Sequence, residues 1–161
     1  MFNNKILLRT GGTGSFGNAV LNKFLNSNIK EIRIFSRDEK KQDDMRRKYQ
    51  NDKIKYFIGD VRDYNRLEMA LRDVDIVIHA AALKHVSIAE YNPYECVHTN
   101  IIGAENIVRA SLRNKVKKVL ALSTDKAVSP INLYGASKLA AEKIFIAANN
   151  IKGSDKTIFS V

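Results

Sequence analysis

Short apolar runs alternate with amphipathic segments along the whole chain, and this alternation limits the possible folds more than any other feature. The apolar runs, expected to be strands, cover residues 5–8, 32–35, 54–58, 76–78, 119–122 and 157–161. The intervening segments, expected to be helices, cover residues 15–26, 38–49, 64–72, 93–113 and 134–150. Strands and helices that alternate through short connections predict an α/β fold, in which helices cover both faces of a doubly wound parallel sheet.

The composition is that of a folded domain without membrane segments. Apolar residues make up 45% and charged residues 27% of the 161 positions, which excludes a disordered chain and fits one domain. No apolar run reaches the length of a bilayer span, and the first residues lack the regions of a signal peptide. Cys96 is the only cysteine, so no internal disulfide can form. We therefore expect a cytoplasmic protein that does not contact membranes.

The formal net charge of +10 favours an anionic partner without identifying it. Between residues 30 and 55, ten Lys and Arg residues alternate with six Asp and Glu residues, a pattern typical of a solvated helix face. Aromatic residues are not interleaved with the basic ones, as they are on many nucleic-acid surfaces. We therefore do not expect a nucleic-acid partner, although the charge alone keeps that class open to a test by salt-dependent DNA binding.

A glycine-rich segment, residues 10–17, connects the first expected strand to the first expected helix. Gly12, Gly14 and Gly17 match the dinucleotide-binding fingerprint, and Gly11 begins a related spacing with the last two. A backbone without Cβ atoms can turn tightly and approach a pyrophosphate, which the free N–H groups of a helix N-terminus then bind. This context predicts a Rossmann-type nucleotide site. The expected contacts are Gly11, Thr13, Gly14, Ser15, Phe16 and Gly17.

The residues after the second strand indicate which dinucleotide to expect. An acidic residue about 20 positions after the glycines would bind the ribose 2′-hydroxyl of NAD, but Ser36 and Arg37 stand there, with Lys41 nearby. The planar guanidinium of arginine suits a phosphate monoester. The sequence therefore predicts NADP, with these three residues as ligands. The alternative is that Arg37 is an ordinary surface residue and that Asp38 binds the ribose.

Two further strand ends carry candidate cofactor contacts. Asp60 and Val61 follow the third strand, where they would meet the adenine edge. Ala80, Ala81 and Ala82 follow the fourth strand, and their small side chains would let the nicotinamide ribose pass close to the backbone. Each group can equally be ordinary packing at a strand end, because alanine is common in protein cores.

The segment after the fifth strand combines the residue types of a redox base. Tyr134 and Lys138 are four positions apart on an expected helix, so they lie on one face of it. An ammonium group beside a phenol lowers the phenol pKa from about 10 by about one to three units, which makes tyrosine a usable base near neutral pH. Thr124 adds a hydroxyl that can hold a substrate oxygen. We expect this segment to be catalytic, because ligands of parallel sheets bind at the carboxyl ends of the strands.

Together these residues resemble the extended short-chain dehydrogenase/reductase superfamily and, within it, the inverting UDP-N-acetylglucosamine 4,6-dehydratases of pseudaminic acid and surface polysaccharide synthesis. The resemblance rests on Tyr134 and Lys138 and on residues 10–17, 35–39, 57–63, 79–86, 88–93, 99–100 and 123–126. It covers essentially the whole chain but only the N-terminal half of such an enzyme. It implies that residues 1–161 are an NADP-binding Rossmann domain, truncated before the substrate domain.

The resemblance also implies a reaction and a role for each residue. Members of the family oxidise the sugar at C4, eliminate water across C5 and C6, and return the hydride to C6 with inversion at C5. Tyr134 would be the redox base, Lys138 its electrostatic partner and ribose ligand, and Thr124 the residue that orients the C4 oxygen. Asp125 would protonate the leaving hydroxyl, and Lys126 would act at C5 if burial or a cation lowers its pKa. The alternative for this last pair is an ordinary surface ion pair.

By the same resemblance, ligand contacts extend beyond these segments. Lys84 would contact the cofactor, and His85, Thr99 and Asn100 would contact the UDP-N-acetylglucosamine substrate. The family also implies a homo-oligomer. No metal site is expected, because the three histidines lack the spacing of paired ligands.

Two residues and the chain length depart from the family pattern. Arg9 stands in a first strand that is normally aliphatic, so its charge either reaches past the strand end toward the loop phosphates or marks a damaged copy. Ser87 replaces a common proline, a milder change. The second half of the family fold, which supplies most uridine diphosphate contacts, is missing. A non-catalytic dinucleotide-binding or interaction module is therefore the rival hypothesis, and a retaining dehydratase or an epimerase is the nearest enzymatic one.

Overall fold

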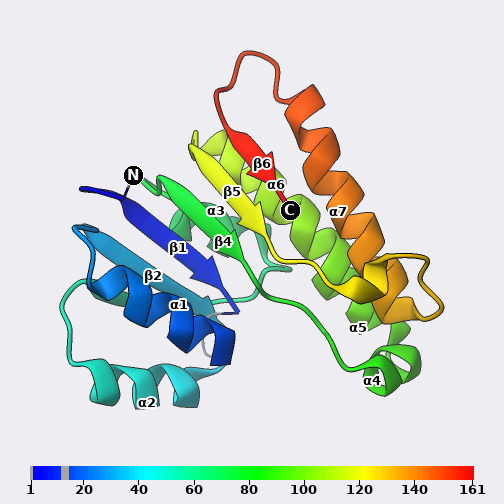
Figure 1. The fold of residues 1–161 in the computed structure, drawn as a ribbon, viewed down its shortest axis with the longest axis horizontal. Helices are drawn as coiled ribbons and strands as arrows, with labels where there is room; N and C mark the ends of the chain where they lie inside the picture. The colour runs from blue at the N-terminus through cyan, green and yellow to red at the C-terminus, as the bar shows by residue number, and fades with distance from the viewer. Residues whose placement is uncertain (1, 12–14) are drawn as a thin grey trace.

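The computed structural model describes residues 2–11 and 15–161, with only the backbone of Ser15 and Phe16, and contains one parallel sheet (Figure 1). Its strands are β1 (Ile6–Thr10), β2 (Glu31–Ser36), β3 (Ile54–Ile58), β4 (Ile76–His79), β5 (Lys118–Ala121) and β6 (Ile158–Ser160). They lie in the order β3-β2-β1-β4-β5-β6, and every neighbouring pair is parallel. The predicted doubly wound, Rossmann-type sheet is confirmed.

Helices connect these strands and cover both faces of the sheet (Figure 1). They are α1 (Ser15–Leu25), α2 (Glu39–Tyr49), α3 (Tyr64–Ala70), α4 (Val86–Tyr91), α5 (Pro93–Val97), α6 (Gly103–Arg113) and α7 (Leu133–Ile151), with a π-helical turn η1 (His98–Ile102) and a 3₁₀ turn η2 (Asp125–Ala127). The sequence did not predict α4 or η2. The single helix expected over residues 93–113 was wrong in detail, because η1 divides it into α5 and α6.

Two hydrophobic cores hold the helices against the sheet. On one face Leu8 and Val119 of the sheet pack against α3, α6 and α7, for example against Ile107 of α6. On the other face Leu7 and Ile34 pack with α1 and α2. Successive side chains of a strand point to opposite faces, so the central strand β1 is buried along its whole length.

Strand β1 extends two residues beyond the expected 5–8 because its polar residues find buried partners. Arg9 is 1% exposed, and its Nη1 donates to the carbonyl oxygen of Gly17 in the first turn of α1. Burial lowers the pKa of Arg9 to about 10, against a smaller opposing influence of Tyr49, so the side chain stays charged at neutral pH. Thr10 follows it, fully buried, and bonds to His79 at the end of β4.

Candidate functional site

Most of the predicted cofactor residues meet in one cavity at the carboxyl end of the sheet. The cavity has a volume of about 550 Å³ and lies where β1 neighbours β4, the point at which the strand order reverses. Ligands of open α/β sheets bind at this point. The predicted residues that line it are Gly11, Gly17, Ser36, Arg37, Lys41, Asp60, Val61, Ala80, Ala81, Ala82, Lys84, Thr99, Tyr134 and Lys138.

The glycine turn after β1 touches the backbone that follows β4. Gly11 has a φ of +64°, and a Cβ atom there would lie 2.7 Å from the nitrogen of Ala81 and 2.8 Å from the oxygen of Ala80. Only glycine fits both this conformation and this approach. Of the other predicted loop residues, Thr13 and Gly14 lie outside the described residues, and so do the side chains of Ser15 and Phe16.

Behind the cavity, the buried residues Thr10 and His79 bond to each other and hold the end of β1 against the turn that follows β4. The Thr10 hydroxyl accepts hydrogen bonds from the backbone N–H groups of Ala80 (3.2 Å) and Ala81 (3.3 Å), and its oxygen lies 2.8 Å from Nδ1 of His79. Burial, and secondarily the charge of Lys138, lowers the pKa of His79 to about 3. The imidazole is therefore neutral, and we assign the Thr10 proton to the bond with Nδ1. Sequence reasoning missed this pair; polar residues at buried strand positions were the available signal.

The segment from the end of β2 into α2 presents two cations to the cavity. The Arg37 side chain is 55% exposed, and its Nη1 lies 3.5 Å from Oδ2 of Asp60. Asp38 caps α2 by accepting from the backbone of Lys41 (2.9 Å), and the Lys41 ammonium lies 3.1 Å from the same carboxylate. These contacts hold the pKa of Asp38 below its usual value. The Ser36 hydroxyl accepts from the Asp38 backbone at 3.2 Å.

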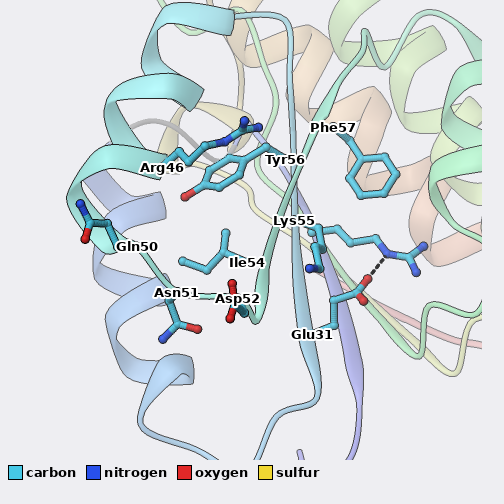
Figure 2. Close-up of a pocket in the computed structure, with 10 residues that line it drawn as sticks. Glu31, Arg46, Gln50, Asn51, Asp52, Ile54, Lys55, Tyr56 and Phe57 are labelled. Carbon is cyan, nitrogen blue, oxygen red and sulfur yellow. Dashed lines mark hydrogen bonds and ion pairs between the residues drawn. The ribbon is translucent and has the colours of Figure 1, made fainter.

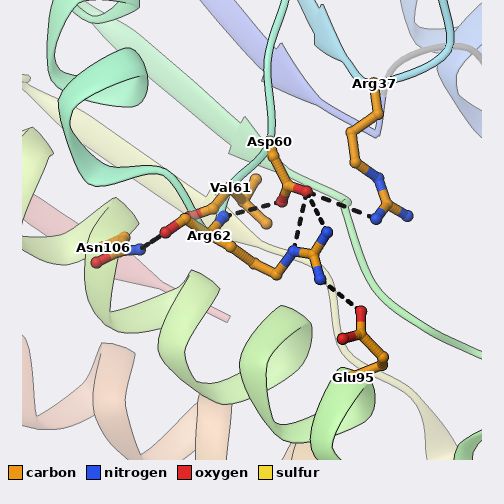
Figure 3. A network of polar contacts seen from close by, with 6 residues as sticks. All are labelled: Arg37, Asp60, Val61, Arg62, Glu95 and Asn106. Carbon is orange, nitrogen blue, oxygen red and sulfur yellow. Dashed lines mark hydrogen bonds and ion pairs between the residues drawn. The ribbon is translucent and has the colours of Figure 1, made fainter. Parts of the chain in front are cut away.

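Asp60, at the end of β3, is held by a polar network that extends to α5 and α6 (Figure 3). Arg62 donates to Oδ2 of Asp60 through Nε (2.9 Å) and Nη2 (2.6 Å), and its backbone N–H donates to Oδ1 (3.0 Å). The Arg62 Nη1 also donates to Glu95. Burial alone would raise the pKa of Asp60, but the Arg62 hydrogen bonds outweigh burial and lower it. The carboxylate is therefore charged.

The start of α7 is anchored at several points, which fixes Tyr134. Asn132 caps the helix through the Gly135 N–H (2.8 Å), and Glu90 of α4 accepts from the Leu133 N–H (2.7 Å). Tyr134 is 9% exposed and lines the cavity. One turn later, Lys138 donates to the carbonyl oxygen of Leu122 at 2.5 Å. Burial lowers the pKa of Lys138, against a smaller opposing influence of Glu142.

The other predicted catalytic residues lie beside the cavity rather than in its lining. Thr124 donates to Oδ1 of Asp125 at 2.9 Å and accepts from the Lys126 backbone at 3.4 Å. The side chains of Asp125 and Lys126 are 86% and 50% exposed, and their charged atoms are 3.6 Å apart. In this structure they form a surface ion pair, the alternative that the sequence left open.

The predicted substrate residues are separated by the fold. Thr99 in η1 is 5% exposed, lines the cavity, and its buried hydroxyl has no hydrogen-bond partner among the described residues. Asn100 is 2% exposed and does not line the cavity. Its side chain accepts from the Leu83 N–H (2.8 Å) and donates to the Leu83 carbonyl (2.9 Å) and to Ser137 (2.9 Å). His85 is exposed at the start of α4.

The cavity also contains residues that were not predicted as ligands. Gly59 lies where a Cβ atom would collide with the Phe35 ring, so glycine keeps the ends of β2 and β3 together. Phe35, Leu122 and Ser123 complete this set, and Asp38, which the sequence offered only as the alternative ribose ligand, lines the cavity as well. All of them lie at or just after the end of a strand, which is the signal that could have found them.

A second cavity, of about 660 Å³, follows the outer edge of the sheet along β3 (Figure 2). Arg46 lies over the ring of Tyr56 there, 5.2 Å from its centroid. None of the predicted site residues lines this groove. In residues 2–11 and 15–161 no helix is long and apolar enough to cross a membrane, and no cluster of His, Cys, Asp or Glu side chains is suited to a metal ion.

Comparison with known proteins identifies close relatives over the whole chain. The family model described as polysaccharide biosynthesis protein matches residues 7–161. A UDP-glucose 4-epimerase of Rickettsia bellii (strain OSU 85-389) and an inverting UDP-N-acetylglucosamine 4,6-dehydratase of Campylobacter jejuni (strain 81-176) are each 59% identical over 100% of this chain and 48% of their own length. The X-ray structure of Pen from Bacillus thuringiensis is 44% identical, with a TM-score of 0.97 over 99% of this chain and 50% of that one. The chain thus spans about half the length of the curated relatives it matches.

Proposed function

The chain belongs to the polysaccharide biosynthesis protein family, and we propose that it is the NADP-binding and redox portion of a UDP-N-acetylglucosamine 4,6-dehydratase that inverts C5. One observation carries this proposal. The cavity at the strand-order reversal joins the Gly11 turn, Asp60, and the pair Tyr134 and Lys138 of α7, which come from three distant parts of the sequence. The dehydratase named among the relatives, 59% identical, supports the same reaction.

The described residues fit a dinucleotide. The tight approach of Gly11 to Ala80 leaves room for a pyrophosphate beside the backbone, and Thr99, whose hydroxyl has no hydrogen-bond partner among the described residues, lines the same cavity. Arg37 and Lys41 favour the 2′-phosphate of NADP, because both cations line the cavity. When bound, the nicotinamide would accept a hydride from the sugar and later return it.

The chain's own residues would perform the proton transfers. Tyr134 would take the proton of the C4 hydroxyl, and the buried Lys138 would stabilise the resulting phenolate. Thr124 would orient the C4 oxygen. A proton would first pass from Lys126 to Asp125, because the pair is charged and the Thr124 hydrogen bond and Lys126 hold the pKa of Asp125 below its usual value. The neutral Lys126 amine would then remove the C5 proton, and the protonated Asp125 would give its proton to the C6 hydroxyl, which leaves as water. These last two steps require both side chains to turn from their ion pair toward the sugar.

The test combines cofactor titration with turnover of UDP-N-acetylglucosamine by the purified chain. We expect tighter binding of NADP than of NAD, and a 4-keto-6-deoxy product with inverted C5. Tyr134→Phe should retain NADP binding but lower turnover by at least about a hundredfold, because the general base is lost. Equal or tighter NAD binding would refute the NADP assignment. A folded, NADP-bound protein that forms no product would be a nucleotide-binding fragment and would contradict turnover by this chain alone.

A 4-epimerase is the second candidate, and a specific observation favours it. Epimerisation at C4 needs a redox base but no elimination, and Tyr134 and Lys138 line the cavity whereas Asp125 and Lys126 do not. The epimerase named among the relatives supports the same alternative. Analysis of the product separates the two reactions, since a dehydratase product has lost one water and an epimerase product has not.

A further inference from the structure

Two arginines approach the same carboxylate oxygen, and only one of them lines the cavity. Arg62 places two donors on Oδ2 of Asp60, at 2.9 and 2.6 Å, whereas Arg37 stays 3.5 Å away without a hydrogen bond (Figure 3). Arg37 and Asp60 line the cavity, and Arg62 lies outside its lining. Arg62 therefore supplies the hydrogen bonds to this oxygen, and Arg37 contacts it only as a longer ion pair.

We propose that Arg62 is a positioning residue: by taking the hydrogen bonds of Asp60, it leaves the donors of the Arg37 guanidinium available to the 2′-phosphate of the cofactor and so sets the preference for NADP over NAD. This inference rests on the proposed dinucleotide function. Without Arg62, the charged Asp60 would have Arg37 as its nearest cation, and a charge-assisted hydrogen bond would draw that guanidinium away from the cofactor. NAD has no phosphate at this position, and the backbone N–H of Arg62 still holds Asp60, the expected adenine contact of both cofactors, so NAD binding should change less.

The local charges support the same conclusion. Arg37, Asp60, Arg62 and Glu95 form a chain in which two cations alternate with two carboxylates. Removal of Arg62 leaves one cation against two carboxylates beside the place of the phosphate. Asp60 would then draw the remaining cation, Arg37, toward itself and away from the phosphate.

The backbone at this turn does not depend on the Arg62 side chain. Asn106 of α6 is 5% exposed and donates to the carbonyl oxygens of Val61 (3.0 Å) and Arg62 (3.1 Å). The backbone N–H of Arg62 donates to Oδ1 of Asp60 at 3.0 Å whatever side chain it carries. A shorter side chain at position 62 therefore leaves the turn anchored, and its effect falls on the charges.

The experiment measures dissociation constants for NADP and NAD with Arg62→Met, Arg62→Lys and the control Arg113→Met. Arg113 is a 75% exposed residue of α6, paired with Glu68, so its replacement removes the same charge elsewhere. We expect Arg62→Met to weaken NADP binding about tenfold and to change NAD binding less than about twofold, as for the loss of one charge-assisted hydrogen bond. Arg62→Lys should lose less, because it keeps the charge, and Arg113→Met should leave the ratio unchanged.

A double-variant cycle with Arg37→Met completes the test. If Arg62 acts through Arg37, adding Arg62→Met to Arg37→Met should not lower the NADP to NAD preference further. Equal weakening of both cofactors by Arg62→Met, or an additive effect in the double variant, would overturn the inference. Failure of the unsubstituted protein to bind either cofactor is a different result, because it contradicts the proposed function itself.

Discussion

His79 is a buried titratable residue that contributes to the site without lining the cavity. Its Nδ1 lies 2.8 Å from the Thr10 hydroxyl, which in turn holds the backbone N–H groups of Ala80 and Ala81. The imidazole is 3% exposed and packs beside the Phe145 ring. A neutral histidine suits this place, because an imidazolium would be desolvated near the Lys138 ammonium.

The first prediction concerns the dependence of stability on pH. The pKa of His79 is about 3 in the folded protein and about 6.5 in the unfolded chain, so only the unfolded chain binds this proton between those values. The stability that the neutral His79 contributes to the folded protein is fully present above pH 6.5 and is lost as the pH falls toward 3. When the pH is lowered from 7 to 5, the free energy of unfolding of the unsubstituted protein should fall by about 2 kcal/mol more than that of His79→Asn. Urea unfolding at both pH values measures the difference.

His98→Asn is the matched control, because His98 is exposed, and it should keep the pH dependence of the unsubstituted protein. The same dependence in His79→Asn as in the unsubstituted protein would show that His79 titrates normally in the folded state.

At the level of elements, the π-helical turn η1 joins the segment after β4 to α7. Asn100 satisfies both the N–H and the carbonyl of Leu83 and also donates to Ser137, whose hydroxyl donates to the Tyr134 carbonyl at 2.8 Å. The turn thus holds three segments in register around the cavity. Sequence resemblance placed Asn100 against the substrate, and that contact remains a prediction.

The second prediction separates these two roles of Asn100. Asn100→Leu should lower the free energy of unfolding by about 2–4 kcal/mol, because it leaves two backbone groups of Leu83 without buried partners. Asn150→Leu, on the exposed face of α7, should change it by less than about 0.5 kcal/mol. Thermal and urea unfolding measure both variants. Unchanged stability of Asn100→Leu together with weaker substrate binding would favour the direct substrate contact instead.

At the level of the whole molecule, the two faces of the sheet are covered unequally. Helices α6 and α7 bury Val119 and Phe159 on one face. On the opposite face α1 and α2 pack over β1, β2 and β3, while Leu120 of β5 and Ile158 of β6 remain 41% and 49% exposed. These two apolar side chains are therefore exposed on neighbouring strands of the same sheet face.

The third prediction tests this uneven coverage. The double variant Leu120→Thr/Ile158→Thr should bind less of a hydrophobic dye and scatter less light at high concentration, because the exposed apolar area is smaller. Its free energy of unfolding should change by less than about 1 kcal/mol. Val119→Thr, one residue away but on the covered face, should cost more than about 1 kcal/mol. Equal destabilisation by the Leu120→Thr/Ile158→Thr double variant and by Val119→Thr would show that helices cover both faces of β5 and β6 equally, and would contradict this prediction.

Local patterns in the sequence determined the α/β class, most element positions and the place of the glycine turn after β1. Alternation of apolar runs, a glycine between strand and helix, and Tyr134 four residues before Lys138 are all short-range signals. Such signals report how a segment folds and which of its faces is buried. The local signals predicted one continuous helix over residues 93–113 and missed the π-helical turn η1 within it. The side chain of Asn100 in this turn bonds to the backbone of Leu83, which belongs to a different segment of the chain.

Only the tertiary structure decided which side chains share an environment. The bond from Thr10 to His79 spans 69 residues, and that from Arg62 to Glu95 spans 33. The same folding placed Asp125 and Lys126 in a surface ion pair and Arg9 under α1. The physical reason is that a charge or hydrogen-bonding group takes its role from neighbours that the chain brings close in space, and local periodicity carries no information about those neighbours.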